Sequence, residues 1–297
     1  MRWISYRTTE GAEGVGIAAA GGYHGLSVAD LGADLLALVT QGKDAQERAA
    51  DRLASQPVIA ADTIRFLPVM PRPSKIICIG LNYLAHSNEA GFKAPDYPAV
   101  FARYATSLVA HRAPIVRPHA SEQLDYEGEL AVIVGRGGRH IAGADALNHV
   151  AGYSIFNDGS IRDYQRKSPQ WTIGKTFDGT GGFGPELVTP EELPPGCKGL
   201  SLETKLNGEV VQRASTDDLI FDVARLISIL SEAMTLAPGD VIVSGTPAGI
   251  SAARTPPLWM KPGDVCEVSV EGVGTLSNPI AQETPLAGGA IEGQGAC

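Results

Sequence analysis

The sequence predicts an α+β protein, with a small α/β unit at residues 1–70 and a larger, strand-rich domain at residues 71–285. Two observations lead to this expectation. Strand and helix patterns are mixed in the first unit, whereas short apolar runs separated by glycine and proline dominate the rest. Residues 286–297 are rich in glycine, and we expect a flexible tail there.

The N-terminal unit begins with a short strand pattern at Trp3–Tyr6, followed by a glycine-rich turn region. Helical patterns follow near Ala29–Leu38 and Asp44–Ala54. A proline-punctuated joint from Leu67 to Pro73 then separates this unit from the rest of the chain. Nothing in the unit resembles a catalytic motif, so we expect the chemistry to lie in the large domain.

In the large domain the sequence predicts strands, one hairpin and two helices. Asn207-Gly208 lies between the runs Leu202–Leu206 and Glu209–Arg213, which is typical of a type I′ hairpin. Apolar residues at helical spacing from Leu219 to Leu230 predict a helix, with Ser215 or Thr216 as its N-cap. The other expected elements are strands at Ile76–Ile79, Glu129–Val134, Ala151–Phe156, Val241–Ser244 and Val265–Val270, and a short helix at Tyr83–Ala90.

Composition restricts the classes of partner. With 297 residues, of which 44% are hydrophobic and 19% charged, the chain can bury a substantial core. Its 24 Lys and Arg against 33 Asp and Glu give a net charge of −9. Because nucleic-acid binding needs clustered cations, we expect no such partner. We expect no signal peptide and no membrane partner, because no apolar stretch approaches the ~18 residues that a span requires.

The four cysteines, Cys78, Cys197, Cys266 and Cys297, lie far apart and lack the spacing of a metal finger. Cys78 and Cys266 fall in apolar, strand-like runs, where a reduced thiol behaves as a small core residue. We therefore expect a reducing, cytoplasmic location.

The segment Asp125-Tyr-Glu-Gly-Glu-Leu130 carries the sharpest chemical signal. Side chains alternate along a strand, so Glu127 and Glu129 point to one face, roughly 7 Å apart at the backbone. Two such carboxylates repel each other unless a cation lies between them, and a hard divalent cation is the natural partner. On spacing alone, a solvated strand edge with two surface acids is the alternative. Leu130 and the alternate apolar residues to Val134 would face the core on the opposite side.

A third carboxylate follows the next strand pattern, in Phe156-Asn-Asp-Gly-Ser-Ile-Arg-Asp163. Either Asp158 or Asp163 could complete a site with three carboxylates. The residues alone do not choose between them, and a surface ion pair between Arg162 and Asp163 is the simpler alternative.

Three further motifs offer chemistry near such a site. Lys175 lies in an otherwise uncharged, glycine-flanked stretch and could hold a substrate carboxylate or an enolate, although a lone lysine is usually a surface residue. The turn Gly245-Thr-Pro-Ala-Gly249 exposes backbone N–H groups and a hydroxyl. His86 and Glu89 have i, i+3 spacing on a short helix, so the carboxylate could orient the imidazole as a general base. An exposed pair with no role is the alternative.

Together these segments resemble the fumarylacetoacetate hydrolase superfamily, in particular its acylpyruvase type. The resemblance covers roughly residues 72 to 283, and the order and spacing of the segments make it specific. The segments concerned are Ile76-Ile-Cys-Ile-Gly-Leu-Asn-Tyr-Leu-Ala-His86, Asp125–Leu130, Gly152–Asp158 with Arg162-Asp163, Gly174-Lys-Thr-Phe-Asp178, Asn207-Gly208 with Gln212, Leu236–Ile242 and Gly245–Gly249.

The resemblance implies a mixed β-roll or β-sandwich fold for the large domain and assembly as a homodimer. It also implies Mg²⁺ or Mn²⁺ held by Glu127, Glu129 and Asp158, with Asp163 as a structural partner. The remaining site residues that it implies are the catalytic His86, Glu89 and Lys175 and the substrate-binding Arg103, Arg162, Gln165, Gly245 and Thr246. At one position the chain departs from the pattern, because Arg103 stands where many relatives carry lysine in a Phe-x-Lys motif.

The implied activity is hydrolysis of a carbon–carbon bond in a 2,4-diketo acid, such as an acylpyruvate, fumarylpyruvate, maleylpyruvate or a fumarylacetoacetate-like compound. The cation would hold the 2-keto acid and stabilise a pyruvate enolate, as in the catabolism of aromatic compounds. His86, oriented by Glu89, would activate the attacking water. Oxaloacetate-type decarboxylation, or isomerisation or hydration on the same metal site, is the alternative reaction. A metabolite-binding protein without catalytic activity is the remaining alternative.

Overall fold

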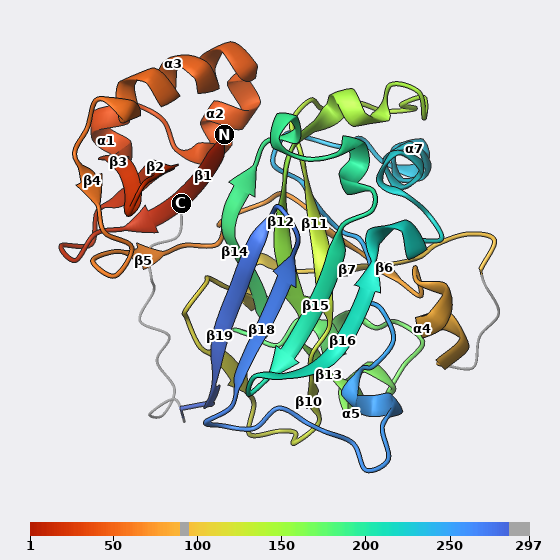
Figure 1. Ribbon diagram of the computed structural model, residues 1–297. Coiled ribbons are helices and arrows are strands. Elements are labelled where there is room, and N and C mark those ends of the chain that lie inside the picture. The colour runs from red at the N-terminus through yellow and green to blue at the C-terminus, as the bar shows by residue number, and fades with distance from the viewer. Residues whose placement is uncertain (90–94, 285–297) are drawn as a thin grey trace.

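A mixed sheet of 12 strands extends from the N-terminal unit to the far edge of the large domain (Figure 1). The computed structural model describes residues 1–89 and 95–284. The strand order is β4-β3-β2-β1-β14-β12-β11-β17-β6-β7, with β5 beside β1 and β8 beside β14. These strands are β1 (Arg2–Arg7), β2 (Glu13–Ala19), β3 (Gly22–Ser27), β4 (Val58–Ile59), β5 (Arg65–Phe66), β6 (Ile76–Gly80), β7 (Ala99–Arg103), β8 (Leu108–Val109), β11 (Gly128–Val134), β12 (Val150–Asp158), β14 (Gly181–Val188) and β17 (Val241–Val243).

A second sheet of five strands packs against one face of the large sheet. Its order is β16-β15-β18-β19-β9, and only the β19–β9 pair is parallel. The strands are β9 (Ile115–Arg117), β15 (Ser201–Leu206), β16 (Glu209–Ser215), β18 (Val265–Val270) and β19 (Gly274–Gln282). Two short strands, β10 (Leu124–Asp125) and β13 (Ser160–Ile161), form a separate pair. In Figure 1 the blue and teal strands of the second sheet lie in front of β11 and β12.

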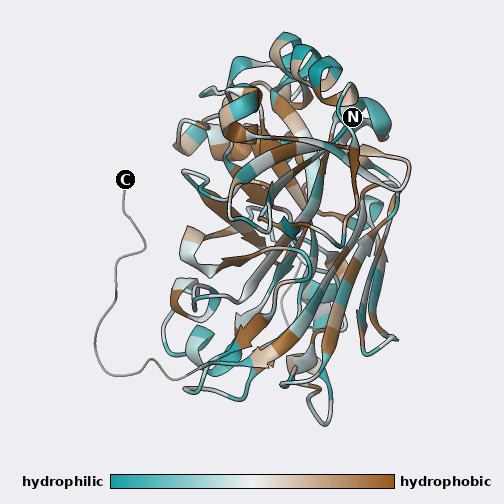
Figure 2. Ribbon diagram, turned by 90° about the vertical axis from the view of Figure 1, so that its left-hand side faces the viewer, coloured by the Kyte–Doolittle hydropathy of each residue, from teal (hydrophilic) through white to brown (hydrophobic). Residues whose placement is uncertain are grey.

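Both faces of the large sheet are buried. On one face, Leu130, Val132 and Val134 of β11 pack with residues of the second sheet and of helix α7 (Val223–Ala233), as the strand alternation predicted. On the other face, Ala131 and Ile133 pack with apolar residues of the N-terminal helices. The central strands therefore read as continuous apolar runs, because each side chain meets a core. Figure 2 shows hydrophobic residues along these inner strands.

Helices occupy the ends and the outer faces of the sheets. The helices are α1 (Val28–Leu31), α2 (Leu35–Gln41), α3 (Lys43–Ala54), α4 (Leu84–Glu89), α5 (Arg162–Gln165), α6 (Thr172–Lys175) and α7 (Val223–Ala233). Short 3₁₀ turns lie at η1 (Ala105–Ser107), η2 (Ala146–His149), η3 (Pro190–Glu192), η4 (Pro195–Cys197), η5 (Thr216–Asp218) and η6 (Ser251–Ala253). This mixture of helix and strand confirms the predicted α+β class.

Three local predictions need correction. The helix expected near Ala29–Leu38 is two helices, because Gly32 ends α1 in the left-handed region at φ 81° and Asp34 caps α2. The glycine-rich stretch after β1 is not a turn region but the β2–β3 hairpin. Helix α7 begins at Val223 with Asp222 as its N-cap, whereas Ser215 caps the 3₁₀ turn η5.

The expected Asn207-Gly208 hairpin is confirmed, with φ values of 54° and 85° at its two central residues. The predicted boundary near residue 70 stays a prediction, and β1 on one side of it pairs with β14 on the other. The predicted tail at 286–297 and Cys297 lie outside the described residues. Within the described ranges, no helix is long and apolar enough to span a bilayer.

Candidate active site

The antiparallel pairing of β11 with β12 brings three distant carboxylates together. Gly128 lies opposite Asn157, and the backbone N–H of Asp158 donates to the carbonyl of Glu127 at 2.9 Å. One carboxylate oxygen from each of Glu127, Glu129 and Asp158 lies within 4.8 Å of the others, and all three residues are buried. The alternative of a solvated strand edge is therefore wrong.

Gly128, between the two glutamates, allows close packing of the second sheet. A Cβ atom here would lie 2.1 Å from Oγ1 of Thr204, so a larger residue would push β11 away from β15. The Gly128 N–H donates to Gln212 at 3.0 Å, and its carbonyl accepts from the Thr246 hydroxyl at 3.1 Å. Gln212 also donates to that hydroxyl at 2.9 Å. These contacts fix the backbone from which both glutamates project.

Two cations neutralise Glu127. The ammonium of Lys175 donates to Glu127 and, at 2.6 Å, to Asp158. The guanidinium of Arg162 donates to Glu127 at 2.5 Å and to Asp125 at 2.7 Å. Burial opposes ionisation, but Arg162 and Lys175 outweigh it and hold the pKa of Glu127 at about 2. The same carboxylates raise the pKa of Lys175 against the effect of its burial, so it stays charged.

The simpler interpretation of Arg162, a surface ion pair with Asp163, is wrong. Arg162 is buried and directs its nitrogens to Asp125, Glu127 and Gln165, the last at 2.8 Å. Asp163 instead accepts from the hydroxyl of Ser121 at 2.6 Å. Of the two aspartates that the sequence offered as a third carboxylate, Asp158 is the one that lies beside Glu127 and Glu129.

Glu129 is the uncompensated carboxylate of the cluster. Its bond within the described residues is to the backbone N–H of Gly245. Burial, followed by the charges of Asp158 and Glu127, raises the pKa of Glu129 well above its ordinary value. Gly245 can approach because it has no side chain, since at φ 106° a Cβ atom would lie 2.7 Å from Cβ of Asn82. The cluster thus holds a buried acid that still needs a cation.

His86 and Glu89 form the pair expected on α4. The Nδ1 atom of His86 lies 3.4 Å from a Glu89 carboxylate oxygen, and the His86 side chain is 8% exposed. The Glu89 carboxylate also accepts from the Gly249 N–H at 3.0 Å, which ties the helix to the turn that follows β17. Nε2 of His86 is left as the ring nitrogen available to other groups.

A cavity of about 480 Å³ opens over the carboxylates. Of the residues predicted for the site, those that line it are His86, Glu89, Glu127, Glu129, Arg162, Gln165, Lys175 and Thr246. Asp158, Arg103 and Gly245 lie behind it, and the described lining residues do not include them. Arg103 is buried against Asp158 at 2.5 Å, so its predicted contact with substrate stays a prediction without support from its position.

Sequence reasoning missed the aromatic wall of the cavity. Trp171 and Phe101 line it and pack edge to face, with ring centroids 5.4 Å apart, and the Lys175 ammonium lies 5.0 Å from the Phe101 ring centre. An aromatic residue four positions before Lys175 in a polar stretch was the available signal. Arg166, at the end of α5, is a further lining residue that was missed.

Residues 75–281 match the model of the fumarylacetoacetate (FAA) hydrolase C-terminal family. The chain belongs to this family. The chain is 38% identical over 243 residues to the human mitochondrial oxaloacetate tautomerase FAHD2A, covering 81% of this chain and 77% of that protein. It is 44% identical over 216 residues to the oxaloacetate tautomerase YisK of Bacillus subtilis, covering 71% of each.

A solved fumarylacetoacetate hydrolase from Exiguobacterium antarcticum shares the fold of this family member, with a TM-score of 0.84 and 36% identity over 95% of this chain and 100% of that one. The likeness confirms the predicted fumarylacetoacetate hydrolase type of fold. The described sheets of this chain contain both parallel and antiparallel strand pairs and do not close on themselves. The chain is thus a member of an enzyme family whose members include differently named activities. The cytoplasmic location stays a prediction, since the human relative is named as mitochondrial.

Proposed function

We propose that this family member is a divalent-metal-dependent tautomerase that interconverts the enol and keto forms of a short 2-oxo dicarboxylic acid, with oxaloacetate as the first compound to test. The observation that carries the proposal is the cluster of Glu127, Glu129 and Asp158 at the base of a cavity, in a chain 38% and 44% identical to proteins named oxaloacetate tautomerases. Relatives at this level of identity favour the isomerase alternative over the hydrolase predicted from the sequence.

The three carboxylates fit Mg²⁺ or Mn²⁺. Both ions prefer oxygen ligands, and a bound cation would stabilise the ionised form of Glu129, whose carboxyl group has no cationic side chain bonded to it among the described residues. Glu127, Glu129 and Asp158 would hold the ion. When bound, the cation supplies positive charge for a carboxylate and its adjacent oxo group and acts as a Lewis acid.

Tautomerisation moves one proton and consumes no water. The enol oxygen on C2 loses a proton, C3 gains one, and the double bond moves from C2–C3 to C2–O, so atoms and charges balance. Lys175, held charged by two carboxylates, provides a fixed positive charge at the floor of the cavity for the oxygen that becomes anionic. His86 lines the same cavity, and its Nε2 exchanges the proton while Glu89 holds Nδ1.

Hydrolysis of an acylpyruvate is the second candidate. The His86–Glu89 pair is equally suited to deprotonating a water molecule, and the hydrolase of Exiguobacterium antarcticum is 36% identical. Decarboxylation of oxaloacetate is another alternative. It would use the same three carboxylates, Glu127, Glu129 and Asp158, and no attacking water. Binding without catalysis predicts metal-dependent affinity for 2-oxo acids and no turnover.

A substrate panel separates these candidates. Purified protein with Mg²⁺ or Mn²⁺ is mixed with enol-oxaloacetate, acetylpyruvate and fumarylpyruvate, and the loss of enol absorbance is followed together with the products. We expect metal-dependent ketonisation of oxaloacetate with no release of CO₂ beyond the blank. Pyruvate from acetylpyruvate or fumarylpyruvate at a higher kcat/KM would establish the hydrolase instead.

The His86→Ala variant tests the proton-transfer role, with His140→Ala, an exposed histidine, as the matched control. We expect roughly a 10²- to 10⁴-fold loss of rate in His86→Ala, which is the ordinary contribution of a general acid–base group. Full activity in His86→Ala would show that His86 takes no part in the reaction.

The homodimer implied by the resemblance also stays a prediction, which light scattering of the purified protein can test.

A further inference from the structure

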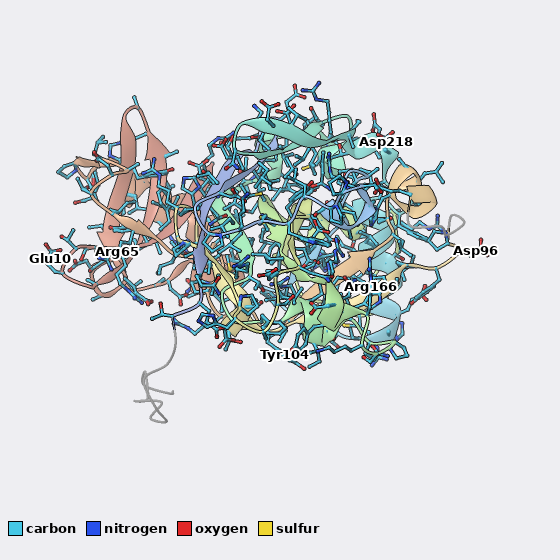
Figure 3. The ribbon with its side chains drawn as sticks, turned by 90° about the horizontal axis from the view of Figure 1, so that it is seen from below. Glu10, Arg65, Asp96, Tyr104, Arg166 and Asp218 are labelled. Atoms are coloured by element: carbon cyan, nitrogen blue, oxygen red, sulfur yellow. The ribbon has the colours of Figure 1, made fainter. Side chains whose placement is uncertain are left out.

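We infer that Arg166 binds the distal carboxylate of the substrate and so selects 2-oxo dicarboxylic acids over monocarboxylic ones. Arg166 is the C-cap residue that follows α5, directly after Gln165, and it lines the cavity while remaining exposed. Figure 3 shows the molecule from below and labels Arg166. The inference rests on the proposed function for the identity of the reacting end of the substrate.

The other strong cations of the cavity already have partners. Lys175 donates to Glu127 and Asp158. Arg162 uses Nε, Nη1 and Nη2 for Asp125, Gln165 and Glu127. Arg166, by contrast, forms no side-chain hydrogen bond or ion pair with any residue in the described ranges, although the Arg162 carbonyl accepts from its backbone N–H at 3.2 Å. Its guanidinium is therefore available to a ligand.

The charge of the buried cluster leaves a specific need for this cation. With Glu129 ionised, as a metal ligand must be, Asp125, Glu127, Glu129 and Asp158 are opposed by Arg103, Arg162 and Lys175, so one negative charge is in excess. A divalent cation reverses the excess to one positive charge, which the carboxylate of a 2-oxo acid balances. A second carboxylate on the ligand then requires another positive charge.

The protein as a whole does not provide that charge, because its net charge is −9. Apolar residues line much of the rest of the cavity, including Ile79, Phe101, Trp171 and Ile250. A carboxylate placed against these apolar residues would lose hydration without gaining a partner. The planar guanidinium of Arg166 can donate two parallel hydrogen bonds to a carboxylate. It therefore binds a carboxylate more strongly and with a more defined geometry than a lysine ammonium, which acts as a point charge.

The experiment compares two unreactive ligands of equal length, 2-oxoglutarate and 2-oxopentanoate, which differ in a terminal carboxylate against a methyl group. Their affinities for the metal-loaded protein are measured by calorimetry and as competitive inhibition constants. We expect the wild-type protein to prefer 2-oxoglutarate by roughly 10- to 100-fold, the range of one charge-assisted contact. Arg166→Gln should bring the two affinities within about twofold of each other and leave 2-oxopentanoate binding unchanged.

Lys167→Gln is the matched control, since it removes the same charge from the next residue. The Lys167 ammonium lies over the Tyr164 ring at 3.2 Å, and Lys167 is not among the described lining residues. This variant should keep the wild-type preference, and Arg166→Lys should keep part of it. In turnover of oxaloacetate, Arg166→Gln should raise KM and leave kcat nearly constant.

Equal affinity of the wild-type protein for both ligands, or a preference that survives in Arg166→Gln, would overturn the inference. Its failure is distinct from failure of the proposed function. A protein that prefers 2-oxoglutarate through Arg166 but does not ketonise oxaloacetate supports the binding role and rejects the tautomerase. A tautomerase that shows no preference supports the proposed function and rejects the binding role of Arg166.

Discussion

The guanidinium of Arg103 lies 2.5 Å from the carboxylate of Asp158, and neither side chain is exposed to solvent. Arg103 also donates to the Gly159 carbonyl at 3.0 Å and to the hydroxyls of Thr180 and Ser107 at 2.8 and 3.2 Å. It therefore holds Asp158 from behind while Lys175 contacts the other carboxylate oxygen. A lysine ammonium carries three donor hydrogens, so it could not make all four of these contacts, to Asp158, Gly159, Thr180 and Ser107.

Replacing Arg103 should test this support. Arg103→Met leaves a buried carboxylate with one fewer cation, and we expect the free energy of unfolding to fall by about 3–5 kcal/mol. Arg103→Lys keeps the charge but leaves acceptors unpaired, so a smaller loss of about 1–3 kcal/mol is expected. Urea denaturation of the metal-free protein measures both losses.

The exposed pair of Arg213 and Glu203 provides the control, since Arg213→Lys should change the free energy of unfolding by less than about 1 kcal/mol. Equal losses in the two Arg103 variants would contradict the multiple-donor role.

Glu129→Gln should abolish the stabilisation that a divalent cation gives the folded protein. Glutamine keeps the shape of the side chain but not the charge that a hard cation requires. For the wild-type protein, Mn²⁺ at 100 times its Kd should add about 2.7 kcal/mol to the free energy of unfolding, whereas the variant should gain almost nothing. Thermal unfolding with and without Mn²⁺ measures this difference.

The metal-free Glu129→Gln protein should be at least as stable as the wild type, because a buried carboxylate with no cation partner is removed. Glu209→Gln, an exposed acid on β16, is the control and should respond to Mn²⁺ as the wild type does. A variant that keeps the full Mn²⁺ response would exclude Glu129 as a ligand.

The sequence predicted the carboxylate pair, Lys175 and the His86–Glu89 pair because each lies in a short local pattern. The two aspartates could not be separated by local reasoning, since the position of Asp158 follows from the register of β11 against β12. Long-range contacts likewise decide that Arg103 lies behind the site. Such contacts join residues far apart in the chain, and no spacing rule reaches across that distance.

Gly80→Ala should reshape the cavity without unfolding the protein. A Cβ atom at Gly80 would lie 2.3 Å from Cζ3 of Trp171, so the indole, which packs edge to face with Phe101, must shift. Because the contact involves the far end of a side chain, we expect a stability loss below about 1 kcal/mol. KM should change several-fold, and tryptophan fluorescence should shift.

The control for this change is Gly143→Ala, at a glycine where an added Cβ meets no atom within 4 Å. It should leave KM and fluorescence as in the wild type. Adding Trp171→Phe to Gly80→Ala should recover part of the wild-type KM, because the smaller ring relieves the clash. A Gly80→Ala enzyme with unchanged KM would show that Trp171 does not shape the substrate site.

His111 joins the N-terminal unit to the second sheet. Its ring packs edge to face on Phe66, with centroids 5.0 Å apart, and its Nδ1 accepts from the backbone N–H of Ser277 at 3.1 Å. Only a neutral imidazole can accept there, because protonation fills the Nδ1 lone pair. Burial, followed by the neighbouring charge of Arg112, lowers the pKa of His111 to about 4.

Stability should therefore depend on pH through His111. A histidine whose pKa is lowered by folding stabilises the protein above its ordinary pKa of about 6.5. This contribution is lost as pH falls from about 6.5 to about 4, where the unfolded chain binds a proton that the folded chain does not. Because the ring is partly exposed, we expect a loss in the free energy of unfolding of no more than about 2 kcal/mol.

The His111→Gln variant keeps a hydrogen-bond acceptor that does not titrate. Urea denaturation of this variant between pH 7 and about 4 should therefore show a flatter dependence of stability on pH than in the wild type. His119→Gln, at an exposed histidine, should follow the wild-type profile, and a His111→Gln profile equally steep would place the acid sensitivity elsewhere.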